Sequence, residues 1–339
     1  MKIVAVMSMR NEVDIIETWV RYYAGKVDHI IITDNLSIDG SGDLVNKLIN
    51  EGLPVSMEVD NRLGHLQTER VHKMMNRAFI EFQADWILLL DADEFLVPLP
   101  GKTFYDILEG LKDNRPLKLA WKTYIPTEND VDDLNVLKRV TYRLENEVNQ
   151  YYKVMVPAKI GENPKTEIMM GNHSIRKGGK DIKAQDAPSG MFLAHFPVRS
   201  MRQVMTKIMV GWLTTLIRPE YAQGDCYHWK LMFDSFIKNE GEAYDNLQNM
   251  AVNYLGVTEN GESPRLVNCP VDEMLLKYSI NYFSDAQCRP FSMFARTAED
   301  IATDYGRMAA EMVAVKSDYE KKDRNVLAFF KKFKNKKEV

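Results

Sequence analysis

The chain has 339 residues, of which 45% are hydrophobic and 27% are charged. These fractions are typical of a soluble globular protein and exclude a disordered chain. Lysine and arginine number 44 and aspartate and glutamate 48, so the net charge is −4 and no basic excess favours binding of a nucleic-acid polymer. Cys226, Cys269 and Cys288 are too few and too far apart for a disulfide framework or a cysteine zinc site.

At roughly 150 residues per domain, the length predicts about two folding units. No run approaches the roughly 18 apolar residues of a membrane-spanning helix. The apolar run at residues 3–7 is too short for a signal peptide and predicts a buried first strand. We therefore expect a cytoplasmic protein.

The first hundred residues alternate between short apolar runs and amphipathic segments. The spacing predicts strands at residues 3–8, 29–33, 54–59 and 86–90, and helices at residues 14–23, 42–51 and 68–83. Continuous apolar strands separated by helices predict an α/β fold with a mostly parallel sheet that is covered on both faces. Further strands are expected at residues 118–125, 153–160, 167–170 and 190–196, and the chain beyond Arg199 is expected to be mainly helical.

Polar clusters follow three of the first four strands. They are Arg10-Asn11-Glu12, Asp34-Asn35 and Asp91-Ala92-Asp93. In parallel sheets ligands bind beyond the carboxyl ends of the strands, so we expect the three clusters to meet on one rim and form the functional site.

Asp91 and Asp93 stand at positions i and i+2 after an apolar strand, so their carboxylates point the same way. Two such carboxylates repel each other unless a cation lies between them, and Mn²⁺ or Mg²⁺ with phosphate oxygens as further ligands meets that need. A solvated turn after the strand is the alternative interpretation.

Taken together, the three clusters, extended to Asp34–Gly40 and to Asp91-Ala92-Asp93-Glu94-Phe95, resemble the family 2 glycosyltransferases. The similar branch has Arg-Asn-Glu after its first strand and a metal motif that reads Asp-X-Asp-Glu-Phe. Residues 171–174 and 195–200 also resemble segments of that branch. The resemblance covers residues 1–210 and implies a GT-A fold, with a nucleotide-sugar half at 1–100 and an acceptor half at 101–210. A helical C-terminal region at 211–324 and a tail at 325–339 would follow.

The resemblance also implies roles in donor binding. Asp34 would contact the uracil ring, and Asn35 and Asp39 would shape the turn, which for Asp39 is equally plain turn chemistry. Asn11 and Glu12 would border the same pocket, although Glu12 could equally be a charge at the start of a helix.

Four cationic or amide side chains could reach the diphosphate. Gln67 and Arg70 open the helix before the metal strand, and Arg199 and Lys207 lie near a later helix start. Arg70 and Lys207 could equally be solvated surface cations.

The resemblance further implies the metal ligands. Asp91 would contact ribose or metal, Asp93 would be the main ligand, and His195 would be the third, with His173 as its alternative. A neutral imidazole at a strand end suits this role, while a hydrogen-bonded structural histidine is the other interpretation. Trp121, Tyr124, Tyr151 and Tyr152 are candidates for packing against an acceptor sugar.

An inverting sugar transfer needs a carboxylate that takes the proton of the acceptor hydroxyl. In this family the base lies about 90 residues after the metal motif. Asp186 fits that distance, and Glu145, Glu162 and Glu167 are alternatives.

These observations predict a metal-dependent, inverting glycosyltransferase. Its donor would be a UDP-sugar, and its acceptor a saccharide or a lipid-linked sugar of a bacterial surface polysaccharide or lipooligosaccharide. The alternatives are a phosphatase of the haloacid dehalogenase type, which also begins Asp-X-Asp, and an inactive sugar- or nucleotide-binding module.

The C-terminal tail differs in charge from the rest of the chain. Residues 325–339 hold five lysines and one glutamate, a local charge of +4 that leaves −8 on the preceding residues. On a helix, Val326, Phe329, Phe330 and Phe333 share one face, which predicts contact with an anionic membrane. Packing of that face on the body of the protein is the alternative.

Overall fold

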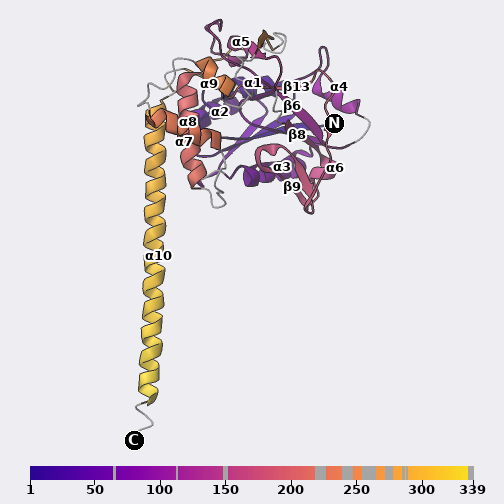
Figure 1. Ribbon diagram of the computed structural model, residues 1–339. Coiled ribbons are helices and arrows are strands. Elements are labelled where there is room, and N and C mark those ends of the chain that lie inside the picture. The colour runs from indigo at the N-terminus through magenta and orange to yellow at the C-terminus, as the bar shows by residue number, and fades with distance from the viewer. Residues whose placement is uncertain are drawn as a thin grey trace. The chain divides into compact units, whose positions relative to one another are not determined.

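The computed structural model describes residues 1–63, 66–111, 114–147, 152–217, 227–238, 247–253, 265–271, 278–284, 287 and 289–334. The chain divides into two compact units, Met1–Met293 and Phe294–Val339, and each is described by itself. Figure 1 traces both units in chain order.

The first unit is built on one large, mostly parallel sheet. Its strands are β1 (Ile3–Met9), β2 (His29–Asp34), β3 (Val55–Val59), β4 (Trp86–Leu90), β5 (Glu94–Val97), β6 (Leu117–Thr123), β8 (Tyr152–Pro157), β12 (Gln185–Asp186) and β13 (Phe192–His195). Their order is β3-β2-β1-β4-β8-β6-β13-β5, with β12 paired to β6. β8 and β5 run antiparallel to their neighbours, and the other pairs are parallel.

Helices cover both faces of this sheet, because successive residues of a strand point to opposite sides. Ile3, Ala5 and Met7 of β1 pack with α1 (Ile16–Ala24) and α2 (Ser41–Asn50). Val4 and Val6 pack with α3 (Gln67–Phe82) on the other side. The prediction of an α/β fold with a mostly parallel, doubly covered sheet is confirmed, and the seven elements expected within residues 1–90 are all present.

Smaller elements surround the sheet. They are α4 (Phe104–Glu109), α5 (Val136–Arg139), β7 (Tyr142–Leu144), α6 (Ala158–Gly161), β9 (Thr166–Ile168), a 3₁₀ turn (Met170–Asn172), β10 (Ile175–Lys177), β11 (Lys180–Asp181) and β14 (Leu266–Asn268). β8 ends at Pro157, earlier than the expected 160, because α6 begins at Ala158.

Three helices follow the last strand of the sheet, as the sequence predicts for the chain beyond Arg199. They are α7 (Met201–Leu216), α8 (Tyr227–Lys238) and α9 (Leu247–Asn253). They enclose a separate apolar cluster that includes Val204, Ile208, Phe236 and Met250. The cluster also includes Val198, three residues after His195.

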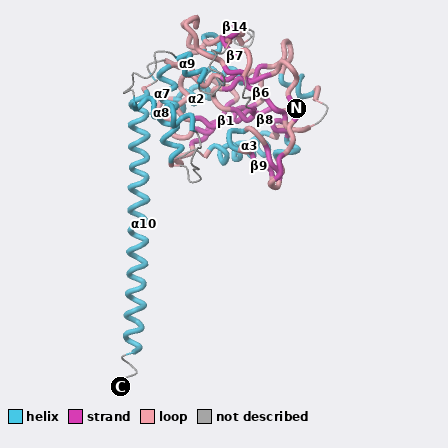
Figure 2. Tube along the Cα trace, viewed as in Figure 1, coloured by secondary structure: helices cyan, strands magenta, loops and turns pink. Residues whose placement is uncertain are grey.

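The described residues of the second unit belong to α10 (Pro290–Lys334), a continuous helix of 45 residues whose first four residues belong to the first unit (Figure 2). Residues 335–339 of the predicted basic tail lie outside the described residues. Among the helices that the structure describes, none is long and apolar enough to cross a membrane.

Candidate functional site

The predicted rim is present. β1, β2, β4, β6 and β13 all run in the same direction, so their carboxyl ends meet at one edge of the sheet. The three polar clusters follow the first three of these strands, and His195 ends β13. The functional site predicted from the sequence therefore has a common location in the fold.

The loops after β1 and β2 are tied to each other by side chains. The Asn11 amide donates to Ser37 Oγ at 2.9 Å, and Asn11 Oδ1 accepts from the Ile38 amide at 2.9 Å. Asp39 accepts from the Val13 amide at 2.9 Å and from the Ser41 hydroxyl at 2.6 Å. Asn11 adopts a φ of 57°, which asparagine tolerates better than most residues. In this structure Asn11 and Asp39 hold the loops together.

Asp34 and Asn35 sit at the end of β2 and are both buried. Asp34 Oδ1 accepts from the Ser37 amide at 3.0 Å, and burial raises the pKa of Asp34. The Asn35 side chain donates to the carbonyls of Asp60 and Arg62 at 3.1 and 2.8 Å. A side chain at Gly42 would lie 2.8 Å from Asp34 Oδ2, so only glycine leaves room for the carboxylate there.

Arg70 is buried and belongs to the same side of the site. Its Nε donates to Asp60 Oδ2 at 2.8 Å, and Arg62 contacts the same carboxylate at 2.9 Å. Hydrogen bonds from Arg62, which outweigh the opposing effect of burial, hold the pKa of Asp60 well below its usual range. Arg70 is thus a buried structural cation here, and its predicted contact with a diphosphate stays a prediction.

Asp93 lies among three cationic or imidazole side chains. Lys207 Nζ is 2.6 Å from Asp93 Oδ2, His195 Nε2 is 3.8 Å away and Arg199 NH1 is 3.9 Å away. Burial favours the protonated acid, but the charges of Lys207, His195 and Arg199 outweigh it and lower the pKa of Asp93 well below its usual range. The side chain of Lys207 keeps 19% of its surface exposed, so it is only partly buried beside Asp93.

Arg199 is fully buried and joins two segments that are far apart in the sequence. Its guanidinium donates to both oxygens of Asp14 at 2.7 and 2.8 Å, to Glu12 at 2.7 Å and to the Phe196 carbonyl at 3.0 Å. Burial raises the pKa of Glu12 to about 7 against the opposing charges of Arg199 and Lys207. Arg199 was expected to contact a diphosphate, but in this structure its guanidinium is hydrogen-bonded to these protein groups.

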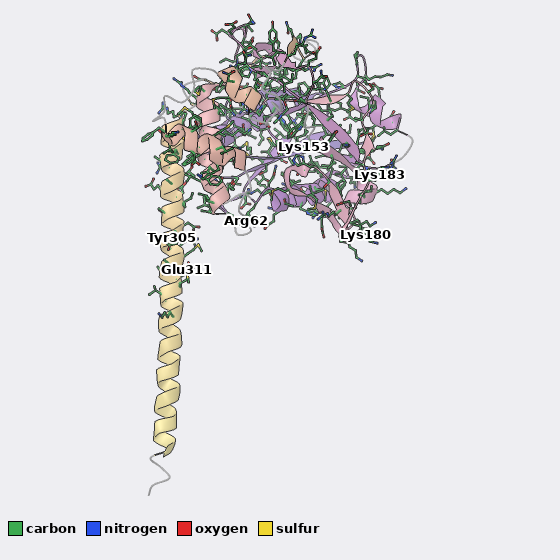
Figure 3. All side chains as sticks on the ribbon, in the orientation of Figure 1. Arg62, Lys153, Lys180, Lys183, Tyr305 and Glu311 are labelled. Atoms are coloured by element: carbon green, nitrogen blue, oxygen red, sulfur yellow. The ribbon has the colours of Figure 1, made fainter. Side chains whose placement is uncertain are left out.

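Asp91 forms an ion pair with a different cation, Lys153. Lys153, on β8, places Nζ 2.6 Å from Asp91 Oδ2 and 3.4 Å from Glu94 Oε1. Gln67 donates to Asp91 Oδ1 at 2.7 Å, and its predicted contact with a diphosphate stays a prediction. Lys153 is labelled in Figure 3 on the sheet of the first unit, and its side chain is only 1% exposed. Burial raises the pKa of Glu94 to about 8 despite the neighbouring Lys153 charge, so this carboxyl is mostly protonated at pH 7.

An aromatic ring connects the two halves of the site. Trp121 stacks on His195 with ring centroids 4.2 Å apart and meets His173 edge to face at 5.8 Å. His173 Nδ1 lies 2.6 Å from the Tyr152 carbonyl, and burial lowers the pKa of His173. Burial, helped by the charges of Lys207 and Lys153, lowers the pKa of His195 to about 4, so its imidazole is neutral at pH 7. Tyr151 lies outside the described residues.

Some side chains at this edge of the sheet are possible ligands of a metal ion. Among the residues that the structure describes, no group of three or more histidine, cysteine, aspartate or glutamate side chains is placed to hold an ion. Asp93 and neutral His195 do lie together, and His195 Nδ1 is buried without a hydrogen-bond partner. This pair fits Mn²⁺ or Mg²⁺, because such ions commonly take one or two protein ligands and complete their shell with water and phosphate oxygens.

Among the predicted bases, Asp186 lies away from this pair. Asp186 is 89% exposed and contacts Lys118 at 3.7 Å near the start of β6, whereas His195 is paired with Thr123 at its end. Five residues of strand separate the two positions by roughly 17 Å. Glu162 and Glu167 are exposed near α6 and β9, and Glu145 contacts Arg265 at 3.4 Å. Asp186 therefore lies at the opposite end of β6 from His195, and the roles proposed for the other three carboxylates stay predictions.

Two residues of the site were missed by the sequence reasoning. Lys153 gave no signal, because a single lysine in the apolar strand of residues 152–157 does not reveal its partners. Glu147 stands two residues beyond the candidate Glu145, and its Oε1 accepts from the Thr123 amide at 2.6 Å. Thr123 pairs with His195, so Glu147 is a carboxylate at the carboxyl end of β6.

No family model and no curated protein matches the chain. HddC from Yersinia pseudotuberculosis aligns with a TM-score of 0.33 and 11% identity, covering 57% of this chain and 93% of that one. The mannosyltransferase PcManGT from Pyrobaculum calidifontis, solved with GDP-Man and Mn²⁺, gives 0.34 and 11%, covering 77% and 76%. GalNAc-T7 with UDP, GalNAc and Mn²⁺ gives 0.37 and 11%, covering 71% and 57%. Scores of this size do not establish a shared fold.

Proposed function

We propose that this protein is a metal-dependent glycosyltransferase with a GT-A fold. It transfers a sugar from a nucleotide-sugar, expected to be a UDP-sugar, to a saccharide or lipid-linked acceptor. The observation that carries the proposal is the meeting of Asp93, His195 and Lys207 at the rim where the parallel strands end. The motif resemblance to family 2 glycosyltransferases supports it independently of that geometry.

In this proposal the diphosphate of the donor binds beside Lys207. The ammonium group of Lys207 is held by Asp93 on a partly exposed side chain, so it would meet an anionic ligand at little cost in reorganisation. Asp93 and His195 would hold Mn²⁺ or Mg²⁺, which when bound stabilises the charge that develops on a diphosphate leaving group. Asp34, at the end of β2, would contact the nucleobase of the donor.

The acceptor would approach from the side of Trp121, whose ring lies between His195 and His173. The oxygen of an acceptor hydroxyl forms a bond to the anomeric carbon, and the bond from that carbon to the diphosphate oxygen breaks. The hydroxyl proton must go to a base, and inversion follows from attack on the face opposite the leaving group. We propose Glu147 for this role, because its carboxylate is at the end of the strand that pairs with His195.

The proposed class of acceptor rests only on the amino-acid composition of the C-terminal tail. The lysine-rich tail suits an enzyme that works at an anionic membrane on lipid-linked sugars, as in the synthesis of bacterial surface polysaccharide or lipooligosaccharide.

Release of UDP from a panel of UDP-sugars in the presence of Mn²⁺ tests the proposal. Asp93→Asn should lower turnover at least about 100-fold with an unchanged tryptophan fluorescence spectrum, while Asp186→Asn, which changes an exposed carboxylate, should leave turnover unaltered. The absence of both UDP release and nucleotide binding would refute the proposal. UDP binding without turnover by the wild type would indicate an inactive binding module, and phosphate release from p-nitrophenyl phosphate would indicate a phosphatase.

The base is tested by a matched pair of variants. Glu147→Gln should lower kcat by about 100-fold or more and leave UDP binding intact, because the donor is still bound but the acceptor is not deprotonated. Glu145→Gln makes the same chemical change two residues earlier and should act like the wild type. Equal losses in both variants would contradict the assignment.

A further inference from the structure

Helix α10 carries an apolar pattern that the proposed function does not use. In the chain, positions 294, 298, 301, 305, 308 and 312 are all apolar, preceded by Phe291 and continued at positions 315 and 319. The intervals alternate between three and four residues over four heptads. An average spacing of 3.5 residues is the signature of a coiled-coil seam, whereas a helix that packs on a globular body follows a period of 3.6.

In the single chain, Phe294, Ala298 and Ile301 of this stripe are partly buried, whereas the side chains that follow them are open to solvent as far as residue 312. Tyr305, Met308 and Met312 expose 73%, 52% and 72% of their surface. Figure 3 labels Tyr305 together with Glu311 on this helix. A long helix gains most of its stability by packing an apolar face, and Gly306 near its middle costs a further ~1 kcal/mol relative to alanine. A partner that covers the stripe would supply this stability.

The charges of the segment argue against a lipid surface as that partner. Residues 294–319 contain five acidic and three basic side chains, a net charge of −2, whereas the +4 charge lies beyond residue 324. Two of the basic side chains are paired within the helix, Arg296 with Glu299 at 3.0 Å and Arg307 with Asp304 at 2.5 Å. Anionic headgroups would repel this stretch, and the favourable basic face of a membrane-surface helix is missing from it.

We infer that residues 291–319 of α10 pair with the same residues of a second copy of this chain in a two-stranded coiled coil. A seam with a 3.5-residue period is complementary to itself, because the side chains at its two alternating positions fill the holes of an identical helix. The inference stands apart from the proposed enzymatic function.

The area of such a pairing is sufficient for a stable dimer. If each of the nine seam side chains per helix buries roughly 60 Å², the two helices together bury on the order of 1,000 Å², the minimum for a specific interface. The flanking charges do not select a direction. Glu311 and Lys316 would attract each other across a parallel pair, and Asp318 and Asp323 would repel. We propose the pairing without its direction.

Sedimentation equilibrium of the full chain, over a wide concentration range, tests the inference. The wild type should have twice the monomer mass. Met308→Glu combined with Met312→Glu places charges in the seam and should raise the dimer dissociation constant by about 100-fold or more. Ala310→Glu combined with Val313→Glu adds the same charges outside the seam and should remain dimeric.

Two further measurements keep the test decisive. All five tryptophans lie within residues 1–293, so an unchanged tryptophan fluorescence spectrum shows that the first unit of the seam variant is folded. A wild type that is monomeric at every concentration overturns the inference, and so does a seam variant that dimerises as well as the control. Monomeric wild type that binds phosphatidylglycerol vesicles through the seam residues would overturn it in favour of a lipid surface.

Discussion

Arg199→Met should destabilise the first unit by about 3–5 kcal/mol, the usual cost of removing one partner from a buried charge pair. Arg199 is completely buried and donates four hydrogen bonds to Asp14, Glu12 and a backbone carbonyl. Methionine fills a similar volume without donating any of them. The loss comes mainly from Asp14, which is 8% exposed and would lose both hydrogen bonds that it accepts from Arg199 in the protein interior.

The size of the effect should depend on pH in a defined direction. The pKa of Glu12 is about 7 with Arg199 present, and it must rise further when that opposing positive charge is removed. At pH 6 Glu12 is therefore protonated in the variant and adds no unpaired charge. At pH 8.5 Glu12 must either ionise without its positive partner or stay protonated although the solution favours the ionised carboxylate. Either state costs free energy, so the destabilisation should be larger than at pH 6.

Urea unfolding followed by tryptophan fluorescence is the assay, because every tryptophan lies in the first unit. Arg62→Met is the control. Arg62 also donates several hydrogen bonds to carboxylates, but its side chain is 55% exposed, so its loss should cost under ~1 kcal/mol. If Arg199→Met cost no more than Arg62→Met, or cost the same at both pH values, the reasoning about the buried bridge would be refuted.

Three other predictions can be checked on the same protein. Lys153→Met should cost about 1–3 kcal/mol in urea unfolding, less than Arg199→Met, because one of its two carboxylates is a third exposed and the other is already mostly protonated. The His195 imidazole should titrate by NMR near pH 4, below its unfolded value of about 6.5. Since the unfolded state then binds more protons, up to about 3 kcal/mol of stability should be lost as the pH falls through this range, and His195→Gln should reduce that loss. Gly161→Ala should cost about 1–3 kcal/mol, because its Cβ would lie 2.3 Å from the Phe79 ring, whereas Gly25→Ala, with nothing within 4 Å, should be nearly neutral.

Local pattern was sufficient to predict the sheet and the edge at which the three polar clusters lie. The apolar runs that became β1, β2 and β4 are continuous, so they signal strands buried on both faces, and parallel direction alone brings their carboxyl ends together. Asp91, Asp93 and His195 could be named because each directly follows or ends an apolar run.

The partners of these side chains could not be predicted in the same way. Lys153 meets Asp91 across 62 residues, and Arg199 meets Asp14 across 185, and neither separation leaves a periodic trace in the sequence. The base was sought by distance along the chain, which led to Asp186. Distance along the chain says nothing about which end of β6 a residue reaches, and Asp186 pairs with its start. Glu147 and its neighbour Glu145 are chemically identical, so only their positions in the folded chain distinguish them.

The charge balance at the rim explains how a protein with a net charge of −4 can present a site for an anionic ligand. Three buried or half-buried cations, Lys153, Lys207 and Arg199, lie beside Asp14, Asp91 and Asp93. Two more carboxyls, Glu12 and Glu94, have pKa values raised by burial to about 7 and about 8, so at pH 7 they carry together less than one full negative charge. The cluster is consequently close to neutral although five carboxyl groups line it. A diphosphate that arrives with a divalent ion would add little net charge, so under the proposed function the site would bind both without first overcoming the acidity of the rest of the chain.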